Sequence, residues 1–179
     1  KFVISREALL KPLNLVAGVV ERRQTLPVLS NVLLQLEGQQ LALTGTDLEV
    51  ELIGRATVEP GGEDGEVTVP ARKLVDICKS LPDNCKLEFT LDQQRVVLKS
   101  GRSRFTLSTL PAGEFPNIEE SPTALDFELR QGDLKRLLDR TSFAMAQQDV
   151  RYYLNGMLWE IKGGDFRVGE IIGLMRDEA

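Results

Sequence analysis

Three segments of the chain carry apolar residues at the three- and four-residue spacing of an amphipathic helix. They are "SREALLKPLNLVAGVV" (5–20), "VPARKLVDICKSLP" (69–82) and "RQGDLKRLLDRTSFAMA" (130–146). In the first, Ser5 stands where a helix cap is expected, whereas Pro12 predicts a kink or a delayed helix start. The pattern therefore predicts three helices.

Between the helices, apolar and polar residues alternate as they do in half-buried strands. Residues 31–58 predict a hairpin around Gly38 followed by a further strand, residues 86–111 predict three strands, and residues 124–130 open another. This order of elements indicates an α+β protein with antiparallel sheets and not a parallel βαβ fold. The stretch "PNIEESP" (116–122) is typical of an interdomain linker.

The chain contains an internal repeat with an offset of 125 residues. Apolar positions match without a gap through one strand, one helix and a hairpin, so that Leu9 falls on Leu134 and the turn glycine Gly38 falls on Gly163. A run of matching core positions over this length indicates two copies of one domain.

The second copy is incomplete. It lacks counterparts of everything from about Gly54 to Leu110, including the second helix. Half a sheet cannot bury its hydrophobic face alone. We therefore expect one complete domain over residues 1–121, and a partial copy over residues 122–179 that folds less well or is rescued by a partner.

Composition narrows the class of protein. The chain has 179 residues, of which 42% are hydrophobic and 27% are charged, which is typical of a globular protein. It has no run of about 18 apolar residues that would predict a transmembrane helix. Its first residues lack the apolar core of a signal peptide, so we expect a cytoplasmic protein.

Several catalytic and metal sites are excluded by residue type. Histidine is absent, which removes Ser-His-Asp and Cys-His catalysis and the commonest metal ligand. No phosphate-binding glycine loop or nucleophile motif is present, and no carboxylate pair stands out from the acidic loops. Cys78 and Cys85 read as small, semi-buried apolar residues, and not as a disulfide framework or a zinc site. The residues favour no enzyme, no cofactor and no metal.

The net charge is −5, yet the charge is segregated along the chain. Residues 5–23, 70–80 and 130–140, which cover the helix candidates, each hold two more basic than acidic residues. Such helices would present one positive surface to nucleic acid, or they would simply carry more Lys and Arg on their solvent faces. On charge alone the two interpretations are equal.

Six local motifs resemble those of one protein family. They are "LLKPL", "TLPVLSNVLL", "LTGTDLEVE", "VPARKLVDICKSLP", "SGRSRFTLSTLPAGEFP" and "FAMAQQDVRYYLNGMLWE", which together cover most of residues 1–162. With the tandem repeat and its basic helices, they resemble the bacterial sliding clamp, the beta subunit of DNA polymerase III.

The resemblance implies a fold and a function. Clamps of this family are homodimeric rings of three such domains per subunit, with two basic helices per domain lining the hole and antiparallel sheets forming the outer wall. They encircle duplex DNA without sequence preference and act as processivity factors, not as enzymes. Clamp loader and polymerase subunits bind them through clamp-binding peptides. This function would favour the first interpretation of the charge distribution, in which the basic helices present a positive surface to nucleic acid.

The resemblance also implies roles for single residues, carried over by motif. It implies DNA contacts at Arg23, Arg72, Lys73, Gln148, Tyr152 and Tyr153, a dimer interface at Arg102, Arg104, Phe105 and Leu107, and one wall of the partner-peptide cleft at Leu154. Tyrosine rings at a DNA-binding loop can stack on bases.

For some of these residues a purely structural role explains the sequence pattern as well. Phe105 and Leu107 alternate with polar residues as in any half-buried strand, so core packing explains them as well as an interface does. Leu154 falls on Leu29 in the repeat, which indicates core packing, and both roles can hold. The arginines of residues 102–104 also fit a charged sheet edge that resists aggregation.

The chain departs from the family pattern after about Lys162. The family continues through a strand into a "TDGHRL" motif, whereas this chain has "DFRVGEIIGLMRDEA". That motif and a third domain supply much of the cleft and the opposing half of the dimer interface, so we expect no two-subunit ring from this chain. Two hypotheses follow: a clamp-derived DNA-binding module, or a truncated clamp that docks on an intact clamp or DNA without closing a ring. An enzyme is a distant third.

Overall fold

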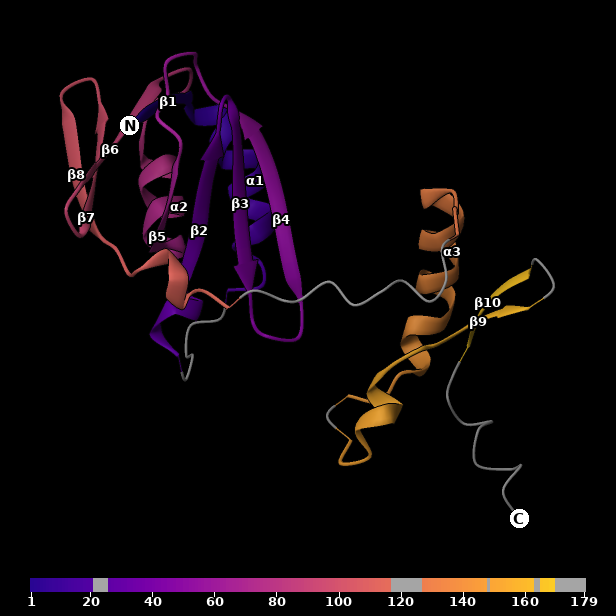
Figure 1. Ribbon diagram of the computed structural model, residues 1–179. Coiled ribbons are helices and arrows are strands. Elements are labelled where there is room, and N and C mark those ends of the chain that lie inside the picture. The colour runs from indigo at the N-terminus through magenta and orange to yellow at the C-terminus, as the bar shows by residue number, and fades with distance from the viewer. Residues whose placement is uncertain (21–25, 117–126, 148, 163–164, 170–179) are drawn as a thin grey trace. The chain divides into compact units, whose positions relative to one another are not determined.

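The computed structural model describes residues 1–20, 26–116, 127–147, 149–162 and 165–169 (Figure 1). Contacts between Cα atoms divide the chain into two compact units, Lys1–Glu120 and Ser121–Ala179. We call them unit 1 and unit 2 and describe each by itself. Apart from Pro116, the predicted linker lies outside the described residues.

Unit 1 consists of two four-stranded antiparallel sheets and two α-helices (Figure 1). The first sheet has the order β1-β6-β7-β8, with strands Phe2–Ser5, Lys86–Asp92, Arg95–Ser100 and Ser103–Ser108. The second has the order β4-β3-β2-β5, with strands Glu51–Thr57, Gln40–Thr46, Asn31–Glu37 and Gly65–Pro70. The helices are α1 (Arg6–Val16) and α2 (Ala71–Ser80), with 3-10 helices η1 (Pro27–Ser30) and η2 (Ala112–Glu114). The predicted α+β class with antiparallel sheets is confirmed.

Strand β5 is an element that the sequence pattern did not predict. It pairs with β2 along its whole length, from Asn31 opposite Pro70 to Leu36 opposite Gly65. The segment is short, and Pro70 falls at the start of the range 69–82, which the apolar spacing predicts as a helix. Pro70 serves both elements, because it ends β5 and occupies the N-cap position of α2.

Helix α1 begins where the sequence predicts. The Ala8 N–H donates to Ser5 Oγ at 3.2 Å, which caps the first turn. Pro12 lies inside the helix and is buried, yet the helix start is not delayed. The ring packs on β4 at Gly54, where an added Cβ would lie 2.7 Å from Pro12 Cβ. Glycine at this position therefore lets the strand backbone approach the proline.

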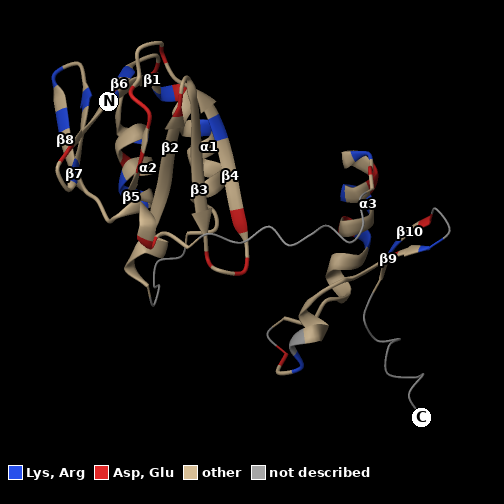
Figure 2. Ribbon diagram, in the orientation of Figure 1, with Lys and Arg blue, Asp and Glu red and all other residues tan. Residues whose placement is uncertain are grey.

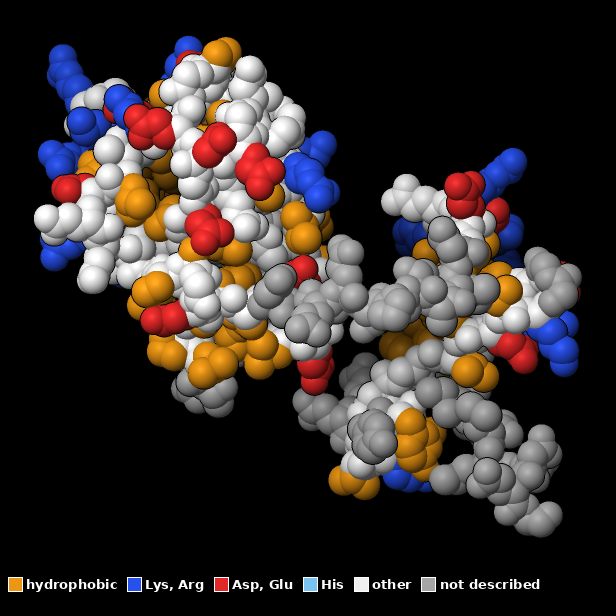
Figure 3. Space-filling view, in the orientation of Figure 1, with side chains coloured by type: hydrophobic (Ala, Val, Ile, Leu, Met, Phe, Trp, Pro, Cys, Tyr) orange, Lys and Arg blue, Asp and Glu red, His pale blue; other side chains and the backbone are white. Residues whose placement is uncertain are grey.

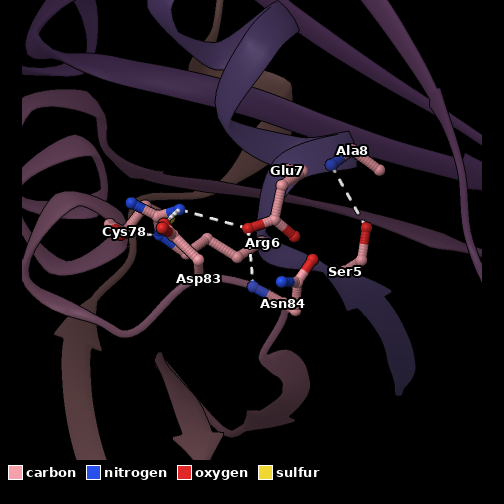
Figure 4. A network of polar contacts seen from close by, with 7 residues as sticks. All are labelled: Ser5, Arg6, Glu7, Ala8, Cys78, Asp83 and Asn84. Atoms are coloured by element: carbon pink, nitrogen blue, oxygen red, sulfur yellow. Dashed lines mark hydrogen bonds and ion pairs between the residues drawn. The ribbon is translucent and has the colours of Figure 1, made fainter.

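Arg6 ties the start of α1 to the end of α2 (Figure 4). Its Nε donates to the Cys78 carbonyl oxygen at 2.6 Å, and its Nη1 donates to Asp83 Oδ1 at 2.6 Å and to Glu7 Oε1 at 3.1 Å. Glu7 Oε1 also accepts the Asn84 N–H at 2.9 Å. Only 13% of the Arg6 side chain is exposed. Arg6 therefore belongs to the framework of unit 1 rather than to a charged surface.

The two cysteines of unit 1 agree with the prediction. Both are free; Cys78 is buried and Cys85 is partly buried. Burial raises the pKa of the Cys78 thiol to about 11, so it stays protonated at neutral pH and is a poor nucleophile.

Unit 2 repeats the first elements of unit 1. It consists of α3 (Gln131–Thr141), η3 (Ser142–Ala144), η4 (Tyr152–Asn155) and a hairpin of β9 (Leu158–Lys162) and β10 (Asp165–Gly169). Helix α3 has the bounds of α1 shifted by 125 residues, and η4 has those of η1. The hairpin keeps the register too, because Leu36 pairs with Leu41 and Ile161 pairs with Phe166. The predicted repeat is confirmed over these elements.

The strand predicted at residues 124–130 is wrong for its described part. Residues 127–130 form no strand, although their counterpart in unit 1 is β1. Strand β1 pairs with β6, whereas none of the described residues of unit 2 pairs with residues 127–130. Alternating apolar residues need a partner strand before they form a ladder.

Unit 2 has no buried core among the described residues. None of those between 127 and 169 is classed as buried, whereas the core of unit 1 contains fully buried residues from both helices and both sheets. Leu34 is 2% exposed in unit 1, and its counterpart Trp159 is 49% exposed. Phe166 packs between Phe127 and Trp159, with ring centroids 5.4 and 5.5 Å away. This aromatic group stands where unit 1 has a closed core.

Candidate nucleic-acid and partner interface

The helices of unit 1 present cations to solvent. Lys11 on α1, and Arg72, Lys73 and Lys79 on α2, are all exposed (Figure 2). Arg72 also has a structural role, because its Nη2 donates to the Val20 carbonyl oxygen at 3.1 Å. The predicted DNA contacts Arg72 and Lys73 are thus neighbouring exposed residues of a helix whose other side is buried in the core.

The basic residues of α3 are partly neutralised on the helix itself. Lys135 Nζ lies 2.6 Å from Asp139 Oδ2, and Arg136 Nη2 lies 3.1 Å from Asp133 Oδ1. Such i,i+4 and i,i+3 pairs on an exposed helix contribute little to stability. The pairs direct Lys135 and Arg136 toward carboxylates of the same helix, while residues 130–140 keep their excess of two basic residues.

A basic hairpin adds to the positive surface of unit 1. Strands β7 and β8 and their turn carry Arg95, Lys99, Arg102 and Arg104, all exposed, and no acidic residue (Figure 2). The three basic segments predicted from the sequence do not include this hairpin, although the run "RVVLKSGRSR" shows it in the sequence.

Of the predicted interface residues, Arg104, Phe105 and Leu107 lie on the edge strand β8, and Arg102 lies in the turn before it. Arg102 and Arg104 are exposed, and Phe105 is partly buried against the core. Leu107 is 3% exposed, so its side chain fills the core of unit 1. The core alternative therefore describes Leu107 in this structure. An edge strand also offers backbone N–H and C=O groups to a partner strand.

The loop Ala146–Gly156 carries the predicted contacts of unit 2. Arg23 and Gln148 lie outside the described residues, and only the backbone of Tyr152 is described. Tyr153 and Leu154 follow it in the 3-10 turn η4, and both are partly buried. The structure thus places three of the predicted residues on one turn that precedes β9, as the repeat predicted.

Hydrogen bonds within the loop fix this turn. Arg151 donates to the Asp149 carboxylate from its backbone N–H at 2.8 Å, from Nε at 3.1 Å and from Nη2 at 3.0 Å. The guanidinium and the N–H of Arg151 lower the pKa of Asp149 to about 2. Asn155 Oδ1 accepts the Asp149 N–H at 3.1 Å, and Asn155 Nδ2 donates to the Asp149 carbonyl at 3.2 Å. The Ala146 N–H donates to the Leu154 carbonyl at 2.9 Å.

Exposed apolar side chains mark one end of unit 1, where β3 turns into β4. Leu48 is 51% exposed and Val50 is 46% exposed, and hydrophobic side chains gather on this face toward that end (Figure 3). Leu48 has a φ of 79°, which is unusual for leucine. Its N–H donates to Thr46 Oγ1 at 3.0 Å, while Asp47 Oδ1 accepts the N–H of Val50 at 2.7 Å. The sequence analysis did not identify this turn.

A cavity of about 280 Å³ lies in unit 1, lined by residues that include Phe2, Leu36, Leu41, Phe89 and Val96. None of the predicted site residues lines it.

Among the described residues, no group of three or more Cys, Asp or Glu side chains is placed to hold a metal ion. No described helix is long and apolar enough to cross a membrane.

Two family models match the chain in order. Residues 1–119 match the DNA polymerase III beta subunit, N-terminal domain, and residues 128–169 match the central domain of the same subunit. The chain belongs to the DNA polymerase III beta subunit family. The two matched ranges fall in unit 1 and unit 2, and the second extends beyond Lys162.

Similar proteins carry the name beta sliding clamp. The one from Pseudomonas aeruginosa is 69% identical over 166 residues, covering 93% of this chain and 45% of its own length. The one from Escherichia coli K12 is 50% identical over 167 residues, covering 93% and 46%. The chain thus spans about half the length of these curated relatives.

Solved structures of this family share the fold. The crystal structure of the DNA polymerase III subunit beta from Pseudomonas aeruginosa has a TM-score of 0.90 at 68% identity, covering 93% of this chain and 45% of that one. The Caulobacter crescentus pol III beta structure has a TM-score of 0.85 at 40% identity, covering 93% and 45%. The predicted DNA clamp fold is confirmed.

Proposed function

We propose that this chain acts in DNA replication as a sliding clamp, the processivity factor that binds duplex DNA without sequence preference and tethers the polymerase to its template. It catalyses no reaction. Tethering raises the effective concentration of the polymerase at the primer end. The observation that carries the proposal is the ordered match of its two units to the N-terminal and central domains of DNA polymerase III beta subunits.

The surface of unit 1 supports this proposal. The exposed cations on α1 and α2 attract phosphates through a diffuse field, which suits binding that is salt-sensitive and independent of sequence. In unit 2, Tyr152 and Tyr153 belong to the turn η4, and we propose that they contact DNA. Together with Arg23 and Gln148 these residues form the proposed DNA contacts.

Protein partners follow from the same assignment. Clamp loader and polymerase subunits would bind through short peptides at a cleft with Leu154 in its wall, and β8 would join a second subunit as in a homodimer. The protein would act in the cytoplasm, where bacterial replication takes place.

A second function is favoured by one feature, the edge strand β8, which carries exposed Arg104 and is preceded by a turn with exposed Arg102. A chain that does not close a ring would dock through this edge onto an intact clamp. Light scattering separates the two functions, because docking gives a complex when the chain is mixed with a full-length clamp. A chain that stays monomeric in that mixture rules the docking function out.

Duplex binding tests the first proposal. We expect fluorescence anisotropy to give equal affinity for duplexes of unrelated sequence, and an affinity that falls steeply with salt. The paired substitution Tyr152→Ala and Tyr153→Ala weakens binding while the circular dichroism spectrum is unchanged. Sequence-specific binding, or no binding at low salt, contradicts the proposal. Retention on circular DNA that is lost on linearisation would show that the protein encircles the duplex.

A further inference from the structure

We propose that Asp149, Arg151 and Asn155 form a clip that positions the turn Tyr152–Asn155, and that Arg151 is a positioning residue and not a phosphate contact. The inference deepens the proposed function and rests on it, because that function gives the turn its DNA-facing and peptide-facing residues. The clip is local and can be tested by itself.

The first half of the clip is the carboxylate of Asp149. Both of its oxygens are engaged by Arg151, which approaches with a backbone N–H and two guanidinium nitrogens at 2.8 to 3.1 Å. The forked contact fixes the direction of the guanidinium as well as its distance. An arginine held in this way is turned toward its own loop, and its charge is compensated there.

The second half is the carboxamide of Asn155. It accepts the Asp149 N–H at 3.1 Å and donates to the Asp149 carbonyl at 3.2 Å, so one side chain satisfies both backbone groups of one residue. This pair of bonds closes the loop across six residues. The turn enclosed by it carries Tyr152, Tyr153 and Leu154. The geometry of the clip therefore sets where these three residues stand.

The internal repeat shows that the fold itself does not require the clip. In unit 1 the equivalent turn η1 begins at Pro27, whose ring restricts its φ. The positions equivalent to Arg151 and Asn155 are Leu26 and Ser30. The same turn thus forms in unit 1 without these two side chains. In unit 2 it is held by polar groups, at the place where the proposed DNA and peptide contacts lie.

The salt dependence of DNA binding distinguishes the two roles of Arg151, as part of the clip or as a phosphate contact. The Arg151 side chain is 61% exposed and the Asp149 side chain is 25% exposed, so the pair lies at the surface and its removal leaves global folding intact. A cation that bridges to phosphate adds one released counterion to the salt dependence of binding. A cation already paired with Asp149 adds none.

The test compares Arg151→Gln, Asn155→Ala and the double variant by duplex anisotropy over a range of salt. The clip predicts that each single variant weakens binding about 3- to 10-fold at every salt concentration. The double variant should lose no more than the weaker single, because the two residues act as a unit. The slope of log affinity against log salt concentration also distinguishes the two roles. If this slope becomes about 0.9 less steep in Arg151→Gln while the affinity of Asn155→Ala is unchanged, Arg151 is a phosphate contact and the clip is overturned.

Arg167→Gln is the matched control for charge. Arg167 pairs with Asp165 at the same two-residue spacing and in the same unit, but through a single 3.9 Å contact away from the loop. We expect its duplex affinity to stay within about twofold of the parent. An equal loss in the control would show that net charge, and not loop geometry, explains the result.

Amide hydrogen exchange tests the clip without DNA. In Asn155→Ala we expect the Arg151 and Leu154 N–H groups to exchange at least about 5-fold faster, because their acceptors lie inside the enclosed loop. Unchanged exchange overturns the clip. Faster exchange with unchanged DNA affinity refutes the positioning role. If the parent chain binds no duplex, the proposed function fails while exchange still decides whether the clip exists.

Discussion

Gly54→Ala tests whether the closest approach of helix to sheet fixes the helical face of unit 1. Gly54 lies on β4 beneath the proline ring of α1. An alanine Cβ would lie 2.7 Å from Pro12 Cβ, 3.1 Å from its carbonyl oxygen and 3.2 Å from its Cα. Two of these three atoms are helix backbone, so a change of rotamer cannot relieve the contact. The helix or the strand has to move.

The expected loss follows from two opposing effects. Overpacking a well-filled contact costs about 1–3 kcal/mol. Alanine also restricts the unfolded chain, which returns roughly 0.5–1 kcal/mol. Because two of the close atoms are helix backbone, we expect the cost of overpacking to be about 2–3 kcal/mol, in the upper half of its range. The free energy of unfolding should therefore fall by about 1–2.5 kcal/mol, which lowers the urea midpoint by roughly 0.5–1.2 M for a typical slope near 2 kcal/mol/M.

Far-UV circular dichroism is the appropriate probe, because the single tryptophan, Trp159, lies in unit 2. Gly113→Ala is the control: nothing lies within 4 Å of an added Cβ there, and the backbone is not in the left-handed region. We expect the control to match the parent or exceed it slightly. A Gly54→Ala midpoint equal to that of the control would refute the reasoning that this glycine is required by the contact with Pro12.

Three further predictions follow from burial and charge. Leu9→Ala removes a side chain with 0% exposure, and urea unfolding should show a loss of about 2–5 kcal/mol. The Asn84 N–H, and then Arg6, hold the pKa of Glu7 below its ordinary value. The stability it contributes is present above its ordinary pKa and is lost as pH falls through the lower folded value, so Glu7→Gln should flatten the decline of the urea midpoint between pH 6 and 3. Trp159 is 49% exposed, so acrylamide should quench its fluorescence in the native chain almost as well as in urea; a strongly shielded tryptophan would contradict the exposed face of β9.

Much of the fold was predictable, because periodicity and the repeat are local signals. The bounds of α3 reproduce those of α1 at the offset read from apolar positions alone, and the β9–β10 register reproduces that of β2 and β3. The strand expected at 127–130 failed for a physical reason. Alternation shows which residues can line a sheet, but a strand also needs a partner. Strand β1 has one in β6, whereas residues 127–130 have none in the described part of unit 2.

The hydrogen-bond partners of charged side chains were less predictable than the fold, since these partners are distant in the sequence. Arg6 counted toward a basic segment, yet it bonds to Cys78 and Asp83, which lie 72 and 77 residues away. Leu107 shows the same limit for an apolar residue, because alternation alone does not separate an edge-strand contact from core packing. The family resemblance named candidate residues, but it did not show which of them were already engaged.

The loop Ala146–Gly156 of unit 2 is held by local bonds and not by packing against a core. Unit 2 buries none of its described residues, so packing alone should not fix a binding turn there. The bonds that hold the turn span only two to eight residues, from Asp149 to Arg151, from Asp149 to Asn155 and from Ala146 to Leu154. Local bonds of this kind form without a closed core, as capping boxes and side-chain turns do. The loop can therefore keep its geometry where the described residues of unit 2 form no buried core, and this makes substitutions in the clip a sensitive test of the proposed DNA contact.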